Sequence, residues 1–201
     1  TGSFGIGTGE FAVMGLLPDI ASDLGVSVPA AGYLISAYAL GVVVGAPMIA
    51  VLGARISRRT LLILLMLGFC LGTLASAAAP TIGTLTALRF LSGLPHGAYF
   101  GVAALVAAAS APPDGRAQAV GRVMLGLTVA TLVGTPLAAW LGQRFGWPAL
   151  FVLVGAVGAL AAGLLAASLP RDQVRAGASG ASELGALRRP QVLLTFLFAS
   201  I

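Results

Sequence analysis

The stretch GAPMIAVLGARIS at residues 45–57 recurs, 89 positions further along the chain, as GTPLAAWLGQRFG at residues 134–146. Gly, Pro, Ala, Leu, Gly and Arg occupy the same register in the two stretches. Chance similarity between helices rich in glycine and alanine is the alternative to a true repeat. A repeat at this spacing predicts a fold made of two structural units of similar design.

The composition around these stretches is that of a membrane protein. Of the 201 residues, 58% are hydrophobic and 8% are charged, whereas about a quarter of the residues of an average soluble domain are charged. Several uncharged segments exceed the roughly 18 residues that mark a membrane-spanning helix. The net charge of +5 does not indicate nucleic-acid binding, because no stretch combines clustered basic residues with exposed aromatic ones. The sequence therefore predicts an all-α membrane protein.

Six hydrophobic segments predict a six-helix transmembrane unit over residues 1–169. The segments are expected at residues 1–17, 28–52, 60–79, 82–109, 117–141 and 147–169. A polar stretch at residues 170–190 predicts a cytoplasmic linker, and an apolar run at residues 191–201 predicts the start of a seventh helix. At about 1.5 Å per residue, that last run is too short to cross a hydrocarbon core of roughly 30 Å.

The arginines of the connecting segments are divided unequally between the two sides of the predicted membrane. One side carries nine of them, which are Arg55, Arg58, Arg59, Arg116, Arg122, Arg171, Arg175, Arg188 and Arg189. The other side carries Arg144 and the acids Asp19 and Asp23. Because positive charge favours the cytoplasmic side, the arginine-rich side is predicted to face the cytoplasm. This topology puts the two copies of the repeat at opposite membrane surfaces, as in transporters built from inverted repeats.

Two ionisable residues fall inside the predicted spans, Glu10 in the first and Arg89 in the fourth. Each lies seven residues from the same outer surface, so helical rise puts both about 10 Å deep. A charge within the membrane costs ~2.5–3.5 kcal/mol on insertion scales, and such residues usually face a cavity and find partners. We expect Glu10 and Arg89 to form a cavity-facing pair that couples transport to protons. A static structural ion pair is the alternative.

His96 follows Arg89 by seven residues, which is nearly two helical turns, so the two side chains are expected on one face of the fourth helix. A neutral imidazole at this position can bind substrate or relay protons. A histidine that is hydrogen-bonded to a neighbouring helix fits the position equally well. Glu10, Arg89 and His96 are therefore the candidates for lining a substrate cavity.

Small residues in the fourth and fifth segments predict close helix packing, because they let the backbones of membrane helices approach each other. They are Gly93, Gly97 and Gly101 in the fourth segment and Gly126, Gly134 and Gly142 in the fifth. Pro95 and Pro136 lack a backbone donor, which predicts a kink at each. A role of these glycines as hinges would be additional to packing.

The sequence carries none of the common enzyme motifs, such as HExxH, a P-loop, GxSxG or a GxGxxG that follows a strand. The acids are too few for a carboxylate-rich metal site, and a single cysteine, Cys70, excludes an intramolecular disulfide. We expect no catalytic residue, no metal and no cofactor, and hence no enzyme.

Three motifs together resemble those of the major facilitator superfamily, specifically its twelve-helix drug:proton antiporters and their sugar- and chloramphenicol-efflux relatives. GTGEF (7–11), followed by GLLPDIASDLGVS (15–27), is similar to the first helix and loop of that group. ALRFLSGLPHGAYFG (87–101) looks like its fourth-helix motif, in which Arg89 is the characteristic membrane arginine. GLTVATLVGTPLAAWLG (126–142) is similar to the antiporter motif of the fifth helix, with Gly126, Gly134 and Pro136 in matching positions.

The chain also departs from the family pattern at three positions. In the cytoplasmic loop motif, with Arg55, Arg58 and Arg59, Ala54 stands where the family usually has an acid. In the antiporter motif, Thr135 separates the glycine from the proline, and Ala138 replaces a common glycine. A gating role of the missing acid therefore does not transfer to this chain.

The resemblance implies the six-helix N-terminal bundle of the major facilitator fold, with inverted three-helix repeats. It also implies a secondary transporter that exports a drug, sugar or metabolite across the bacterial inner membrane by proton antiport and alternating access. The expected partners are the small-molecule substrate, protons, the lipid bilayer and the C-terminal half of the same transporter. A uniporter or importer of the same fold is one alternative, and a membrane scaffold or sensor that does not transport is another.

Overall fold

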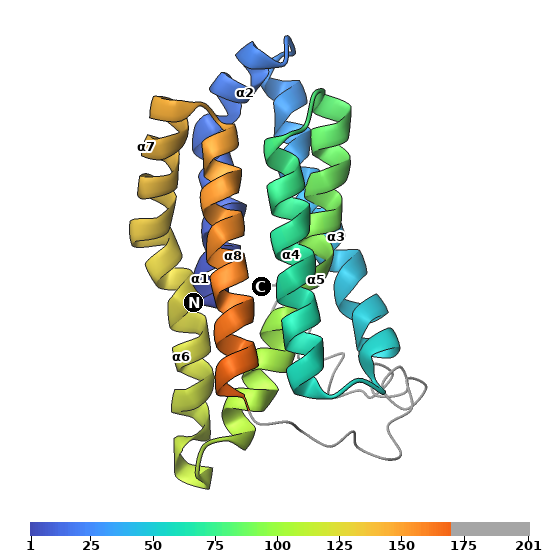
Figure 1. Ribbon diagram of the computed structural model, residues 1–201, viewed down its shortest axis with the longest axis vertical. Helices are drawn as coiled ribbons and strands as arrows, with labels where there is room; N and C mark the ends of the chain where they lie inside the picture. The colour runs from blue at the N-terminus through green and yellow to red at the C-terminus, as the bar shows by residue number, and fades with distance from the viewer. Residues whose placement is uncertain (170–201) are drawn as a thin grey trace, which may run out of the picture.

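Helices make up nearly all of residues 1–169, the part of the chain that the computed structural model describes. Six helical columns run side by side along one axis (Figure 1). No strand occurs within these residues, so the all-α prediction is confirmed. The linker predicted at residues 170–190 and the helix predicted at residues 191–201 lie outside the described residues.

The columns follow the predicted segments closely. Four columns are single helices, namely α3 (Val28–Gly53), α4 (Arg58–Ala77), α5 (Ile82–Ala109) and α8 (Pro148–Ser168). The first column consists of α1 (Gly2–Phe11), the 3-10 turn η1 (Ala12–Leu16) and α2 (Leu17–Asp23). The fifth starts after the 3-10 turn η2 (Pro113–Gly115) and consists of α6 (Arg116–Val129), the π turn η3 (Ala130–Gly134) and α7 (Thr135–Phe145).

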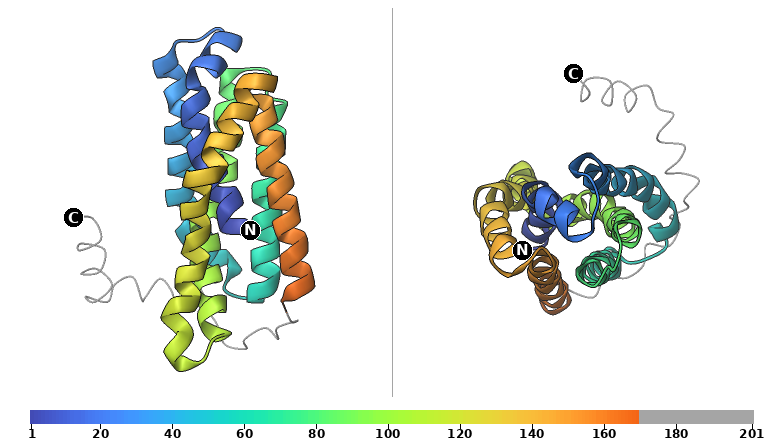
Figure 2. Two further views of the ribbon diagram at one scale, coloured as in Figure 1. Left: turned by 90° about the vertical axis from the view of Figure 1, so that its left-hand side faces the viewer. Right: turned by 90° about the horizontal axis from the view of Figure 1, so that it is seen from above.

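Five helices are long and apolar enough to cross a membrane: α3, α4, α5, α8 and the continuous helical stretch Pro113–Phe145. The first column is divided into three shorter pieces. Seen from above, it lies in the middle of the bundle (Figure 2), and all but one of residues 2–9 are buried. Its apolar residues therefore pack mainly against protein.

Side-chain caps explain where three of the columns begin. Ser27 and Ser57 each accept a hydrogen bond from the backbone N–H three residues later, at 3.3 and 3.2 Å. Thr81 and Thr84 form a reciprocal capping box at the start of α5. A hydroxyl at the N-cap satisfies a backbone donor that would otherwise lack a helical partner. Because these signals are local, the predicted starts of these helices agree with the structure to within two residues.

Two of the six columns, the first and the fifth, are interrupted near their middle. In the fifth column, Pro136 has no backbone N–H, so the carbonyl of Leu132 lacks its α-helical donor. The π turn precedes Pro136 directly, and the N–H of Thr135 donates to the carbonyl of Ala130. In the first column, η1 begins two residues after Glu10. The two interrupted columns are neighbours, since α1 contacts η3 and η1 contacts α7.

The connections between columns gather at two opposite ends. The α3–α4 connection with Arg55, the α5–α6 connection and the C-terminal end of α8 lie at the lower end in Figure 1. The α2–α3, α4–α5 and α7–α8 connections lie at the upper end. Within residues 1–169, the arginines of the predicted cytoplasmic side thus belong to elements that meet at the lower end.

The two copies of the repeat are related by inverted packing as well as by sequence. Residues 45–53 run toward the lower end of the bundle on α3, and residues 134–145 run toward the upper end (Figure 1). Gly45 faces the backbone of Leu94 on α5, whereas Gly134 faces Phe4 and Thr8 on α1. In an inverted three-helix repeat the second and fourth columns correspond to the fifth and first, so these two contacts are equivalent.

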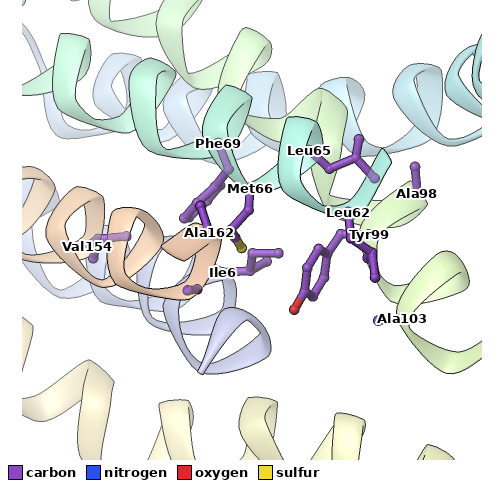
Figure 3. Packing of buried hydrophobic residues seen from close by; sticks show 11 residues of the cluster. Ile6, Leu62, Leu65, Met66, Phe69, Ala98, Tyr99, Ala103, Val154 and Ala162 are labelled. Atoms are coloured by element: carbon purple, nitrogen blue, oxygen red, sulfur yellow. The ribbon is translucent and has the colours of Figure 1, made fainter. Parts of the chain in front are cut away.

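Two apolar clusters fill the bundle, one toward each end. The lower cluster joins α1, α4, α5 and α8 and includes Ile6, Met66, Phe69, Tyr99 and Val154 (Figure 3). The upper cluster joins α2, η1, α3, α5 and the start of α8, and includes Leu16, Ile20, Leu34, Leu85 and Phe151. Along α1 and α5, Glu10 and Arg89 come between the residues of the two clusters. The only charged groups inside the columns at this depth are therefore enclosed above and below by apolar packing, as far as residues 1–169 show.

Candidate functional site

Glu10 occupies the last turn of α1, directly before the 3-10 turn. Its side chain keeps 29% of its surface exposed, in contrast to the buried residues that precede it. Its Oε2 lies 4.0 Å from Nδ1 of His96 on α5. This separation is longer than a hydrogen bond but short enough to close by a small side-chain movement. The imidazole of His96 is 13% exposed, so both groups have limited access from outside the bundle.

Arg89 is almost completely buried, with 1% of its surface exposed. Its Nη1 donates a hydrogen bond of 3.1 Å to the carbonyl of Gly9. Its Cζ lies 4.1 Å from the ring centroid of Tyr38 and 6.0 Å from that of Phe151. Nε and Nη2 have no hydrogen-bond partner among the described residues. A backbone carbonyl and two aromatic faces therefore surround this guanidinium.

The direct ion pair expected between Glu10 and Arg89 is not formed. The residues lie close together, since Arg89 bonds to the carbonyl of the residue before Glu10. The carboxylate instead lies 4.0 Å from the imidazole of His96, which is a cation only when it is protonated. Depth along a helix follows from residue number, but the direction of a side chain around the helix axis does not. The rotation of α1 turns Glu10 toward His96, and Tyr38 covers the guanidinium.

Tyr38 on α3 is the residue that sequence analysis missed. It is 2% exposed, and its hydroxyl lies 3.0 Å from Nδ1 of His96. Because Tyr38 contacts both Arg89 and His96, these two residues share one face of α5, as predicted from their spacing. The hydrogen bond to α3 also agrees with the alternative expectation for His96. A signal for Tyr38 exists in its spacing from Gly41 and Gly45, which puts a polar aromatic residue on a stripe of small residues.

Small residues bring α3 and α5 close enough for these contacts. A side chain at Gly93 would collide with the carbonyl of Tyr38, and one at Gly41 would collide with that of Phe90. At Gly97 an added Cβ would lie 3.0 Å from the side chain of Ala46. Gly101 differs, because no described atom lies within 4 Å of a Cβ built there. On α5, the predicted close approach thus holds for Gly93 and Gly97 and not for Gly101.

Residues 126–142, which resemble the antiporter motif, pack against the first column, which carries Glu10. Gly126 faces Ser3, Gly134 faces Thr8 and Gly142 faces Leu16, and a Cβ at any of these glycines would meet atoms of that column. The π turn before Pro136 belongs to the same contact, and Ala138 is fully buried next to it. The small residues of the fifth column therefore set the position of α1 and η1.

Polar contacts hold α8 at both ends of the bundle. At the lower end, Arg59 donates to the carbonyls of Leu169 (2.8 Å, from Nε) and Ala166 (2.5 Å, from Nη2), which caps the C-terminal end of α8. Arg55, in the same predicted loop motif, is exposed. At the upper end, Nε1 of Trp147 donates a hydrogen bond of 2.7 Å to Asp23.

The described residues hold no cluster of three or more His, Cys, Asp or Glu side chains that could bind a metal ion. Cys70 on α4 is buried, and its Sγ donates to the carbonyl of Gly155 at 3.2 Å. The chemistry available at the site is therefore that of a carboxyl, an imidazole, a phenol and a guanidinium. Such a set can bind polar groups and move protons.

Comparison with known proteins identifies the family. The model of the Major Facilitator Superfamily matches residues 1–201. The chain is 47% identical over 196 residues to the inner membrane transport protein YdhP of Escherichia coli, with 98% of this chain and 50% of that protein covered. A chloramphenicol resistance protein of Streptomyces lividans is 38% identical over 200 residues, which cover 98% of this chain and 51% of that protein.

Two further matches agree with this assignment. A probable sugar efflux transporter of Mannheimia succiniciproducens is 32% identical, over 98% of this chain and 49% of that protein. The proton:xylose symporter XylE has a similar fold, with a TM-score of 0.75, 16% identity, and coverage of 85% of this chain and 43% of the symporter. The chain thus spans about half the length of the curated relatives that it matches.

Proposed function

The chain belongs to the Major Facilitator Superfamily, and we propose that it forms the N-terminal half of a bacterial inner-membrane transporter that exports a small molecule in exchange for protons. Two relatives support export, since their names state chloramphenicol resistance and sugar efflux. A drug, a sugar or a related metabolite is the proposed substrate class. Transport proceeds by rocking of two six-helix halves around a site near the middle of the membrane.

The observation that supports the proposal best is the position of Glu10 beside His96. A carboxyl with 29% exposure, 4.0 Å from an imidazole, is accessible enough to exchange a proton and close enough to pass it on. A purely structural carboxylate would be expected to bind the buried guanidinium of Arg89. Because Arg89 takes its contacts from Gly9 and Tyr38, Glu10 can change its protonation state while these contacts remain.

In the proposed cycle, Glu10 is the proton carrier and Arg89 supplies a fixed positive charge nearby. A charge inside the membrane is unfavourable unless it has a partner, so the charged form of Glu10 is favoured most when His96 and Arg89 are both near. Relative movement of the two halves changes the water access of this site. The acid takes a proton from one side and releases it to the other, and the substrate moves in the opposite direction.

The proposed orientation has the lower end of the bundle in the cytoplasm. Arg55 lies in the α3–α4 connection at this end, and Arg58 and Arg116 are the first residues of α4 and α6. Positive charge near span ends favours the cytoplasmic side. In this orientation, the polar stretch at residues 170–190 is the cytoplasmic linker between the two halves. Arg59, which caps α8 at the same end, holds the last described helix next to the start of that linker.

The full-length protein in proteoliposomes tests the proposal. Substrates from a panel that includes chloramphenicol and sugars are loaded, and flux is followed with and without an imposed pH gradient. Antiport predicts flux against the substrate gradient that stops when a protonophore removes the pH gradient. Flux that runs only down its own gradient and ignores pH would indicate a uniporter, and movement of substrate with protons in the same direction would indicate an importer. No flux of any compound would favour a scaffold or sensor.

A further inference from the structure

The hydroxyl of Tyr38 and the carboxyl of Glu10 approach the same atom. Tyr38 lies 3.0 Å from Nδ1 of His96, and Oε2 of Glu10 lies 4.0 Å from that same nitrogen. An imidazole nitrogen has either one lone pair that accepts a hydrogen bond or one hydrogen that donates one. The two groups therefore compete for Nδ1, and only Tyr38 is at hydrogen-bonding distance.

We infer that Tyr38 gates proton transfer between Glu10 and His96 by occupying, with its hydroxyl, the imidazole nitrogen that would otherwise take the proton from the carboxyl. The inference rests on the proposed role of Glu10 as a proton carrier. Tyr38 is a positioning residue in this scheme, because it gains and loses no proton itself. Its own hydrogen stays on the phenol throughout.

The transfer is balanced for protons. In the first state, Glu10 is a neutral carboxylic acid, His96 carries its hydrogen on Nε2, and Nδ1 accepts a hydrogen bond from Tyr38. The proton then moves from Oε2 of Glu10 to Nδ1 of His96, while the Tyr38 hydroxyl turns away. The products are a carboxylate and an imidazolium, which face each other as an ion pair. The step needs the Tyr38 hydroxyl to leave Nδ1 and the gap of 4.0 Å between Oε2 and Nδ1 to close.

The surroundings of His96 are consistent with a regulated step. The ionisable groups that face this site come from three elements: Glu10 from α1, Tyr38 from α3 and Arg89 from α5. Phe100 packs on His96 with ring centroids 5.2 Å apart, and Tyr99 lies next to Phe100. The guanidinium of Arg89, which contacts Tyr38, already puts a positive charge at this site. An imidazolium at His96 therefore depends on the negative charge of Glu10 for compensation.

The geometry also assigns two separable contacts to Tyr38. Its ring face covers Arg89 at 4.1 Å, and its hydroxyl meets His96 at 3.0 Å. Tyr38→Phe removes only the second contact, so it frees Nδ1 of His96 and keeps the packing of the ring on Arg89. Tyr33→Phe is the matched control, since Tyr33 is on the same helix but 68% exposed.

The test is nitrogen NMR of the full-length protein in lipid nanodiscs, with histidine labelled with ¹⁵N and the His96 signals assigned by comparison with His96→Gln. We expect the ratio of Nδ1-protonated to unprotonated His96 to rise about fivefold in Tyr38→Phe, the equivalent of one ordinary hydrogen bond. Tyr33→Phe should leave the ratio unchanged. Adding Glu10→Gln to Tyr38→Phe should return the ratio to the wild-type value, because no carboxylate is left to form an ion pair with the imidazolium.

An unchanged ratio in Tyr38→Phe would overturn the inference. So would a rise that persists in the double variant, since protonation of Nδ1 would then not depend on Glu10. Wild-type protein adds a test without any change at position 38, because its Nδ1 must be predominantly unprotonated and hydrogen-bonded at neutral pH. These spectra do not depend on transport, so their failure is separate from failure of pH-driven export in the proteoliposome assay.

Discussion

The ring of Tyr38 lies 4.1 Å from the guanidinium carbon of Arg89, and this contact stands where a carboxylate was expected. The charge of Arg89 is buried with only a backbone carbonyl and aromatic rings around it, as far as the described residues show. Cation–π contacts are strongest when both groups are removed from water, as they are here. The burial of Arg89 is therefore compensated by contacts that do not involve the Glu10 carboxylate.

The two contacts of Tyr38 predict different effects of two substitutions at that position. Tyr38→Ala leaves a cavity and uncovers Arg89, so it should lower the free energy of unfolding by about 3–5 kcal/mol. Tyr38→Phe removes only one hydrogen bond and should lower it by about 1 kcal/mol. Unfolding of the purified full-length protein in detergent measures both. Equal losses in the two variants would show that the ring does not stabilise the buried guanidinium.

Gly45 and Gly101 form a matched pair for the packing of α3 and α5. Gly45→Ala puts a methyl group against the backbone of Leu94, so we expect poor expression and a lower melting temperature. Gly101→Ala enters open space and replaces a glycine within a helix, which should stabilise the protein by about 0.5–1 kcal/mol. Thermal unfolding of both variants checks the prediction. A tolerated Gly45→Ala would contradict the close approach of the two backbones.

Arg59 is expected to hold the last turn of α8 in place. Arg59→Gln removes the charge that binds the carbonyls of Ala166 and Leu169, so the end of the helix should fray and lose about 0.5–1 kcal/mol of local stability. Hydrogen exchange of the backbone amides near Leu165 measures this. Arg55→Gln, at an exposed residue of the same loop, should leave the exchange unchanged. Similar exchange rates in both variants would show that Arg59 does not stabilise the C-terminal end of α8.

Thiol labelling checks the orientation of the bundle. In a background without other cysteines, where Cys70 is replaced by alanine, Ser22→Cys near the upper end should react with impermeant reagents applied to intact cells. Ile56→Cys at the lower end should not react until the membrane is opened. Both positions are exposed in the structure, so burial does not decide the result. Labelling in the reverse pattern would invert the proposed topology.

The sequence was sufficient to predict where the helices lie along the chain. Hydrophobic length and local capping signals depend on neighbouring residues, and they give the bounds of α5 at Ile82–Ala109 without error. The shared face of Arg89 and His96 follows from helical geometry in the same way. The interruption at η1 was not predicted, whereas η3 lies directly before Pro136, where a kink was predicted.

The sequence was not sufficient to predict the partners within the site. α1 is apolar on all sides, so periodicity gives no direction for Glu10 around the helix axis. Its orientation results from contacts with the fifth column, such as Gly134 against Thr8, which are formed between segments more than 100 residues apart. Tyr38 was missed for a related reason, since a buried tyrosine in an apolar helix resembles ordinary packing.

Glu10→Gln in the full-length protein tests the central claim most directly. Glutamine keeps nearly the same volume and hydrogen-bonding capacity, but it cannot carry a proton. Asp19→Asn, which removes an acid from the upper end, is the matched control. Export driven by an imposed pH gradient is measured in proteoliposomes, together with the amount of folded protein. We predict that Glu10→Gln folds normally and loses pH-driven export, while Asp19→Asn retains it. Export against a substrate gradient by Glu10→Gln at the wild-type rate would show that Glu10 is not the proton carrier.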